Sequence, residues 1–198
     1  YSPESDPDLL YYASLTTATV REKTEPFDIA IEKEFTGVSR DEKLPRRVAE
    51  IPFDPVRKRN AVLIEDDEHY TLIVRGAPET IISLSSSLSD NQKNELLTWI
   101  RKKGLLGERT IALARRLLDE KPVSISPSIE ANLQFLGIIT FTDPIKPSTF
   151  RAVEKAKELG VYLKIITGDS PEVAGTVGKA IGLLDDPTQV VTGSLLQE

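Results

Sequence analysis

The order of apolar segments after residue 133 places the tightest limit on the fold of this chain. Residues 135–141, Phe-Leu-Gly-Ile-Ile-Thr-Phe, form an almost continuous apolar run, which is typical of a strand buried on both faces of a sheet. A helix pattern spans Pro147–Leu159 and is closed by Gly160, and Val161–Ile166 predicts a second buried strand. Ser170–Ile181 has the pattern of another helix. This β-α-β-α order predicts a parallel sheet.

The part of the chain before residue 133 predicts an antiparallel sheet with flanking helices. Two apolar runs, 61–64 and 70–75, flank an acidic turn and together indicate an antiparallel hairpin. We place the domain boundary after residue 141, so that the two domains span residues 1–141 and 142–198. Further helices are predicted at residues 8–15, 26–35, 78–84 and 91–103, and further strands at 47–53 and 110–115.

The composition narrows the classes of function. The chain has 198 residues and a formal net charge of −6, so it has no basic excess to neutralise phosphates, and we expect no nucleic-acid partner. It has no cysteine and one histidine, which excludes thiolate and imidazole-rich metal sites, and we expect no metal ligands. No apolar run approaches the ~20 residues that span a bilayer.

The tripeptide Thr167-Gly168-Asp169 follows a predicted strand and precedes a predicted helix. In open parallel sheets, ligands bind at the carboxyl ends of strands. Gly168 lets the backbone approach a ligand, and the Thr167 hydroxyl and the helix N-terminus can donate to phosphate oxygens. Asp169 can orient a metal-bound or phosphate-bound partner. The alternative is that Asp169 or Ser170 only caps the helix.

Phe53 lies shortly before three cationic residues that include Arg57 and Lys58. A purine base needs an aromatic face to stack on, worth ~1–3 kcal/mol per base, and a triphosphate needs cations nearby. This segment offers both. The alternative is a core phenylalanine next to solvated charges.

Two turns and a connector complete the candidate sites. Arg75 ends a predicted strand, and Gly76 and Ala77 follow it without a bulky side chain, which permits the close approach of a flat ring or a ribose. Arg109 stands at the start of another strand and can grip a phosphate with its planar guanidinium. Asp143–Pro147 holds two prolines that stiffen the backbone, which suits a hinge. The alternatives are a strand-to-helix turn at Arg75, a position on the surface for Arg109, and an ordinary strand-to-helix connector at Asp143–Pro147.

The order of these motifs resembles that of P-type cation-transporting ATPases over roughly residues 20–185. The series is Phe-x-x-x-Arg-Lys, then (Lys/Arg)-Gly-Ala-Pro-Glu, then Gly-x-Arg-x-(Ile/Leu)-Ala-Leu-Ala, then Asp-Pro-x-(Lys/Arg), then Thr-Gly-Asp. The resemblance implies an α/β fold: a nucleotide-binding domain followed by part of a haloacid-dehalogenase-like phosphorylation domain with a parallel sheet.

The resemblance also implies a role for each matched residue. Phe53 matches the aromatic that stacks on adenine, and Asp28 the acidic position near the adenine amino group. Arg109 matches the arginine that contacts the nucleotide phosphates. The remaining matches are those that line the adenine pocket, Lys58, Arg75, Gly76 and Ala77; the hinge residues Asp143 and Lys146; and the loop that meets the γ-phosphate and the phosphorylated aspartate, Thr167, Gly168 and Asp169.

For the parent protein the resemblance implies ATP and Mg²⁺, an aspartyl-phosphate intermediate, and transport of a cation bound elsewhere. Its partners are then the transmembrane and actuator domains of the same chain, and its location is the cytoplasmic side of a membrane. This sequence departs from the family in three ways: Arg75 replaces a lysine, and the Asp-Lys-Thr-Gly-Thr and Thr-Gly-Asp-Gly-x-Asn-Asp motifs are absent. We therefore expect a fragment that binds ATP weakly and does not hydrolyse it.

Three other functions remain open on the residues alone. The first is a stand-alone nucleotide-binding or regulatory module without transport activity. The second is a haloacid-dehalogenase-like phosphatase, which needs an Asp-x-Asp nucleophile after a buried strand; Asp6-Pro7-Asp8 is the only candidate and no such strand precedes it. The third is a structural interaction domain. The segment 160–183 reads closest to magnesium-type or proton-type pumps, with calcium-type pumps as the alternative.

Overall fold

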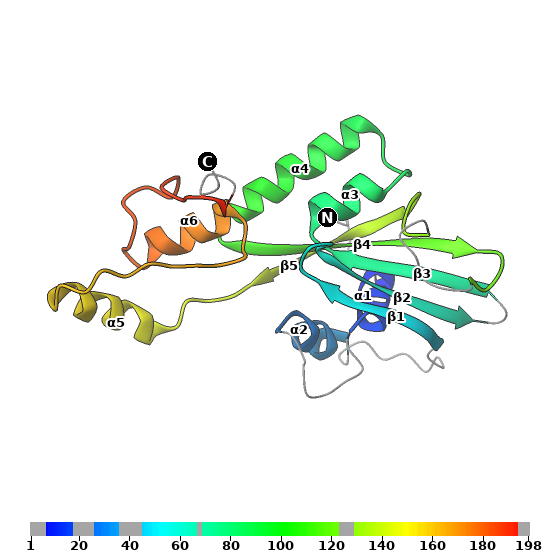
Figure 1. Ribbon diagram of the computed structural model, residues 1–198, viewed down its shortest axis with the longest axis horizontal. Helices are drawn as coiled ribbons and strands as arrows, with labels where there is room; N and C mark the ends of the chain where they lie inside the picture. Colours follow the sequence, from blue (N-terminus) through cyan, green and yellow to red (C-terminus); the bar gives the residue numbers. More distant parts are fainter. Residues whose placement is uncertain (1–6, 18–25, 36–44, 67–68, 123–128, 194–198) are drawn as a thin grey trace. The chain divides into compact units, whose positions relative to one another are not determined.

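The computed structural model of the chain describes residues 7–17, 26–35, 45–66, 69–122 and 129–193 (Figure 1). The chain forms two compact units. Unit 1 comprises Tyr1–Leu97 and Ile111–Ile139, and unit 2 comprises Thr98–Thr110 and Thr140–Glu198. No helix in the described ranges is long and apolar enough to cross a membrane.

A five-stranded antiparallel sheet is the centre of unit 1, as the sequence predicts. The predicted hairpin is confirmed: Ile64 pairs with Thr71 and Asp66 pairs with His69, while residues 67–68 of its turn lie outside the described residues. The strands lie in chain order across the sheet, β1 (Arg46–Asp54), β2 (Arg59–Asp66), β3 (His69–Gly76), β4 (Glu108–Leu118) and β5 (Gln134–Thr142).

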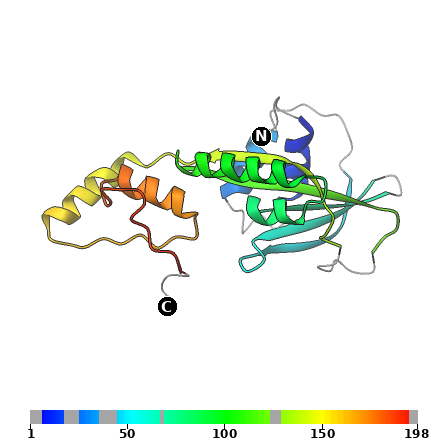
Figure 2. The same ribbon diagram turned by 90° about the horizontal axis from the view of Figure 1, so that it is seen from above.

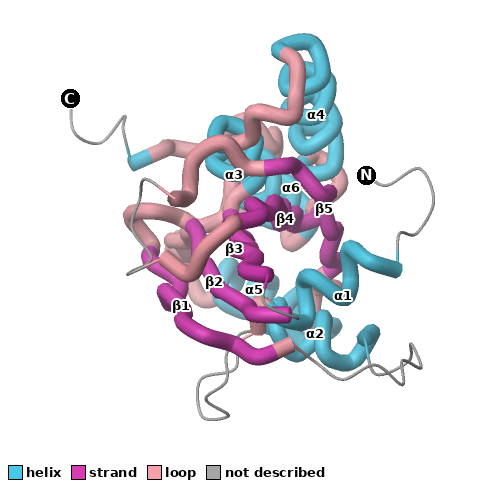
Figure 3. Tube along the Cα trace, turned by 90° about the vertical axis from the view of Figure 1, so that its right-hand side faces the viewer, coloured by secondary structure: helices cyan, strands magenta, loops and turns pink. Residues whose placement is uncertain are grey.

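Helices pack on both faces of this sheet. Helices α1 (Pro7–Leu15) and α2 (Pro26–Phe35) lie on one face, and α3 (Pro78–Leu84) lies on the other (Figure 3). Because side chains alternate along a strand, β2 buries Val62 and Ile64 toward α1, where they pack with Leu15, and buries its other apolar side chains toward the opposite face. The helix α4 (Asp90–Gly104) follows α3, also as predicted.

The apolar run at residues 135–141 forms β5, but not in the predicted parallel sheet. β5 lies at the edge of the antiparallel sheet next to β4, and of its residues only Gly137 and Ile138 are fully buried. An apolar run indicates burial but says nothing about the direction of the neighbouring strand. The prediction of a strand was correct, whereas the prediction of its sheet was wrong.

Unit 2 contains helices α5 (Pro147–Glu158) and α6 (Pro171–Ala180) at the predicted positions. Each begins with a proline in its first turn, and Ser170 caps α6 by accepting a 3.4 Å hydrogen bond from the Val173 N–H. After the helices, Gly160 and Gly182 take φ values of 70° and 77°, which residues with a side chain rarely adopt.

The segment Val161–Ile166, predicted as a buried strand, is coil (Figure 2). Its side chains are exposed. Tyr162 is 96% exposed and Ile166 is 98% exposed. A parallel strand needs neighbours to satisfy its backbone groups, and residues 143–193 of the structure contain no strand. The prediction of a parallel sheet in residues 142–198 is therefore not met within the described part of this segment.

Candidate functional site

The predicted site residues fall into two groups, one in each unit. We call the group in unit 1 the strand-end cluster, because its members lie on α2 and around the adjoining ends of β1, β2 and β3; it consists of Asp28, Phe53, Lys58, Arg75, Gly76 and Ala77. We call the group in unit 2 the Arg109 cluster; it consists of Arg109, Asp143, Thr167, Gly168 and Asp169.

Asp28 and Arg75 form a buried ion pair in the strand-end cluster. Asp28 sits in the first turn of α2 and is 2% exposed, and Arg75 near the end of β3 is 8% exposed. Arg75 Nη2 lies 2.6 Å from Asp28 Oδ1. Charges this deeply buried are tolerated only when they are paired. The two residues that the resemblance places around an adenine base therefore hold each other.

The turn between β1 and β2 presents Phe53 and Lys58 to solvent. Asp54 Oδ1 accepts hydrogen bonds from the backbone N–H groups of Val56 and Arg57, at 2.7 and 3.0 Å. The Lys58 N–H donates to the Asp54 carbonyl at 2.7 Å, and Lys58 takes a φ of 54°. Phe53 remains 49% exposed and Lys58 is exposed. An exposed aromatic and a cation are the groups that a nucleotide needs.

Gly76 and Ala77 pack against this turn. The Ala77 N–H donates to the Lys58 carbonyl at 2.9 Å, and Gly76 pairs with Arg59 across β2 and β3. A Cβ atom on Gly76 would lie 2.6 Å from the Arg59 Cβ and closer still to the Lys58 carbonyl oxygen. The sequence predicted that the missing side chain makes room for a ligand. In the structure the backbone of the neighbouring turn occupies that room.

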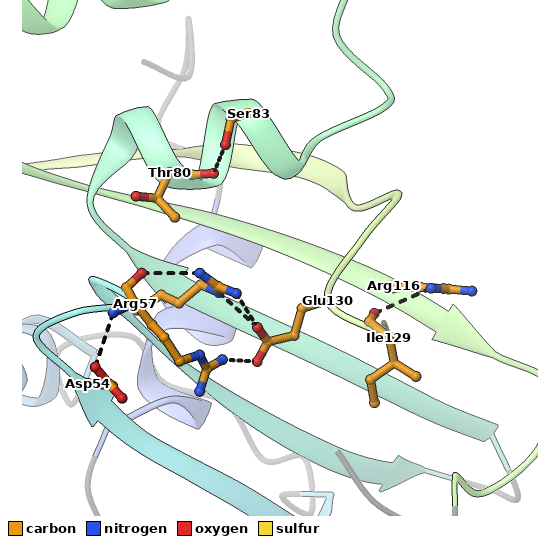
Figure 4. Close-up of polar contacts among 8 residues, drawn as sticks. Asp54, Arg57, Thr80, Ser83, Arg116, Ile129 and Glu130 are labelled. Atoms are coloured by element: carbon orange, nitrogen blue, oxygen red, sulfur yellow. Dashed lines mark hydrogen bonds and ion pairs between the residues drawn. The ribbon is translucent and has the colours of Figure 1, made fainter. Parts of the chain in front are cut away.

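Arg57 turns away from solvent toward a glutamate that the sequence analysis did not single out. Glu130 is fully buried and accepts hydrogen bonds from Arg57 and, at 2.8 Å, from Arg59 Nε (Figure 4). Arg59 also donates to the Arg57 carbonyl at 3.1 Å. Arg57 was a candidate phosphate ligand, but here it is bound to Glu130, a carboxylate that it shares with Arg59. Lys58 is thus the exposed cation of this turn.

The Arg109 cluster joins one guanidinium to two carboxylates. Arg109 Nη2 lies 2.8 Å from Asp169 Oδ2, and Nη1 lies 3.5 Å from Asp143 Oδ2. The Thr167 hydroxyl donates to Asp169 Oδ2 at 3.1 Å. Asp169 does not cap α6, since Ser170 does. A Cβ atom on Gly168 would meet nothing within 4 Å, and Lys146 is exposed at the start of α5.

The pKa of the Asp54 carboxyl lies below its ordinary value of 3.8, because the N–H groups of Arg57 and Val56 donate to the carboxylate. A carboxyl with a lowered pKa in the folded state stabilises the fold above the pKa of the unfolded chain. That stabilisation is lost as the pH falls through the folded pKa.

We expect the melting temperature of the unsubstituted chain to exceed that of the Asp54→Asn variant by a constant margin at pH 5–6. The margin should shrink below about pH 4, where the unfolded carboxyl begins to take up its proton, and vanish at lower pH. Thermal melts between pH 2 and 6 measure this. A margin that grew on acidification would contradict the role given to the carboxylate.

Comparison with known proteins identifies the class. The family model for the cytoplasmic N domain of P-type ATPases matches residues 25–148. The chain therefore belongs to the P-type ATPase family, in which this domain binds ATP.

Its relatives include whole cation pumps. The chain is 31% identical over 179 residues to a probable cation-transporting P-type ATPase of Mycoplasma genitalium. The matched segment covers 88% of this chain and 20% of that protein. It is 32% identical to the magnesium-transporting ATPase, P-type 1, of Salmonella typhimurium, covering 75% of this chain and 18% of that protein. It is 29% identical to a calcium-transporting ATPase of Bacillus subtilis, and that match covers 77% of this chain and 18% of that protein. The chain thus spans about a fifth of these relatives.

Proposed function

We propose that this chain is the ATP-binding part of a cation-transporting P-type ATPase. The observation that carries the proposal is the turn between β1 and β2. It holds Phe53 49% exposed and Lys58 in a fixed left-handed conformation, in a chain that belongs to the N-domain family. In this proposal the adenine base stacks on Phe53, and Lys58, Arg75, Gly76 and Ala77 surround it, with Asp28 holding Arg75 in place.

For unit 2, taken by itself, we propose that the Arg109 cluster contacts phosphate oxygens of a nucleotide. Arg109 is paired with Asp143 and Asp169, so phosphate oxygens have to compete with these carboxylates for the guanidinium. Thr167 and Gly168 complete the loop, and Asp143 and Lys146 flank the proposed hinge. Residues 1–141 then act as the nucleotide-binding domain, and residues 142–198 act as part of the phosphorylation domain. Other segments of the full-length pump complete the haloacid-dehalogenase-like sheet of that domain.

In the full-length pump, ATP phosphorylates an aspartate outside this chain. Formation and hydrolysis of the aspartyl phosphate then drive cation transport on the cytoplasmic side of a membrane. Mg²⁺ neutralises charge on the phosphates. The described residues contain no group of three or more His, Cys, Asp or Glu side chains that could hold a metal, so we assign no residue of this chain to it. By itself the chain then binds ATP without hydrolysing it.

Replacing Phe53 by alanine should weaken ATP binding about 5- to 150-fold, since stacking on an aromatic is worth ~1–3 kcal/mol per base. Calorimetric or chemical-shift titrations of the unsubstituted chain and of the variant with ATP measure this loss of affinity. If the unsubstituted chain binds ATP with a dissociation constant of ~1 mM, such a loss almost abolishes binding.

Phe150→Ala is the matched control for this experiment. Phe150 on α5 is 46% exposed, close to the exposure of Phe53, but it belongs to no candidate cluster. Its loss should leave the ATP dissociation constant unchanged. Equal weakening by both variants, or no ATP binding by the parent at millimolar concentration, would contradict the proposed site and favour a structural interaction domain.

A further inference from the structure

The buried side-chain atoms that lack a hydrogen-bond partner among the described residues include Asn60 Oδ1, Arg75 Nη1 and Arg57 Nε, and the first two belong to residues that pair across β2 and β3. Both residues are 8% exposed. Buried acceptors and donors in folded proteins are almost always satisfied, so each exception asks for an explanation. A ligand that brings one donor and one acceptor supplies both partners.

The two side chains lie side by side. Asn60 and Arg75 are directly opposite each other in the β2–β3 pair, so they project from the same face of the sheet. The two free atoms are complementary, yet they are not bonded to each other. They therefore present an adjacent acceptor and donor to a third group.

Neighbouring residues fix which atom of each side chain is free. Asn60 Nδ2 donates to the Thr16 carbonyl at 2.9 Å. Because a carbonyl can only accept, the amide must point its nitrogen there and its oxygen away. Arg75 is held through Nη2 by Asp28, which leaves Nη1 as the free donor.

We propose that Asn60 and Arg75 select the purine base of the nucleotide. A 6-aminopurine offers an exocyclic N–H₂ donor next to a ring-nitrogen acceptor. Asn60 Oδ1 accepts from the 6-amino group, and Arg75 Nη1 donates to the adjacent ring nitrogen. A 6-oxopurine places an oxygen opposite the Asn60 oxygen, and two acceptors repel. The proposal rests on the proposed function, and it makes Asn60 the residue that distinguishes ATP from 6-oxopurine nucleotides.

Binding at these atoms involves a local rearrangement. Both atoms are covered in the structure, so the base reaches them only as neighbouring side chains move aside. The rearrangement is favoured because the base bonds to groups that otherwise lack partners. An amide held by Thr16 and a guanidinium held by Asp28 keep their orientation during this step.

The test compares ATP with inosine triphosphate, which differs at the purine 6-position and lacks the amino group. Dissociation constants for both are measured with the parent and with Asn60→Leu, which removes the acceptor at similar volume. The parent should prefer ATP by about tenfold, since a matched donor–acceptor pair discriminates bases to that extent. In Asn60→Leu the ratio should fall to about one through weaker ATP binding, while inosine triphosphate binds as before.

Asn91→Leu, on the exposed surface of α4, is the matched control and should keep the parent's ratio. A parent that binds both nucleotides equally, or an Asn60→Leu variant that keeps the preference, overturns this inference and leaves the proposed function standing. If the unsubstituted chain binds neither nucleotide, the proposed function is overturned instead. If Asn60→Leu does not fold, the parent's ratio together with the chemical shift of the Asn60 side-chain amide decides: a shift with ATP alone supports the inference, and no shift contradicts it.

Discussion

Replacing Glu130 by alanine should destabilise unit 1 by about 3 kcal/mol, since removing one partner of a buried ion pair costs about 3–5 kcal/mol. The Glu130 side chain is fully buried, and it binds Arg57 and Arg59, whose side chains are only 22% and 14% exposed. Without the carboxylate, two guanidinium groups remain in a poorly solvated place with no counter-charge. Because both arginines keep part of their surface in contact with solvent, the loss lies at the lower end of that range.

Amide hydrogen exchange of β2 and β3 in increasing urea measures this loss specifically in unit 1. The fluorescence of Trp99, which belongs to unit 2, reports on the other unit in the same samples. Exchange in β2 and β3 should become faster, whereas the Trp99 transition should move less.

Glu50→Ala is the matched control for the glutamate. Glu50 also pairs with an arginine, Arg47, at 2.7 Å, but its side chain is 38% exposed. Exposed pairs contribute about 0–1 kcal/mol, so this variant should be nearly neutral. Equal losses in the two variants would show that burial of Glu130 is not the source of its effect.

The Glu130 network also shows what the sequence could not predict. Helices and strands up to residue 142 have local signals, such as the periodicity of α2 and the alternation around the β2–β3 turn, and their positions were predicted correctly. Glu130, in contrast, lies 71 and 73 positions from its two arginines and follows no recognisable motif. Only the folded chain shows that Arg57 is bound to Glu130 while its neighbour Lys58 stays exposed.

The strand predicted at 161–166 was wrong for a related reason. Its apolar run was read correctly as a segment suited to burial, but a strand exists only when other strands pair with it. None of the described residues beyond 142 offers that pairing. The helices on either side need no such partners, because their hydrogen bonds are internal, and both formed as predicted.

Asn60 was not a candidate in the sequence analysis, because a single asparagine in an apolar strand carries no pattern. Its significance depends on three contacts made in space: the pairing with Arg75, the bond to Thr16 and the ion pair of Arg75 with Asp28. Arg75 could be selected in advance from the Arg-Gly-Ala turn at the end of its strand, whereas Asp28 could be selected only through the resemblance. Nothing in their local sequence predicted that they bind each other.

Replacing Gly76 by alanine should destabilise unit 1 by about 3 kcal/mol, the upper end of the usual cost of overpacking. The added Cβ would meet backbone, namely the Arg59 Cα at 2.7 Å and the still closer Lys58 carbonyl oxygen. Backbone in a paired strand cannot rotate away as a side chain can, so the β2–β3 pair must separate locally. The separation also displaces the turn that carries Lys58, so ATP binding should weaken together with stability.

Gly137→Ala separates this effect from the general cost of adding a methyl group to a strand of unit 1. Its Cβ would meet the end of the Leu9 side chain, at 2.8 Å, and that side chain can change rotamer. We therefore expect a loss of about 1 kcal/mol or less and an unchanged ATP dissociation constant. Hydrogen exchange of the β2 and β3 amides and ATP titration provide both readouts. If Gly76→Ala proved as mild as Gly137→Ala, the close contact between Gly76 and the Lys58 turn would not be what requires glycine there, and the turn could not be the rigid support that the proposed nucleotide site needs.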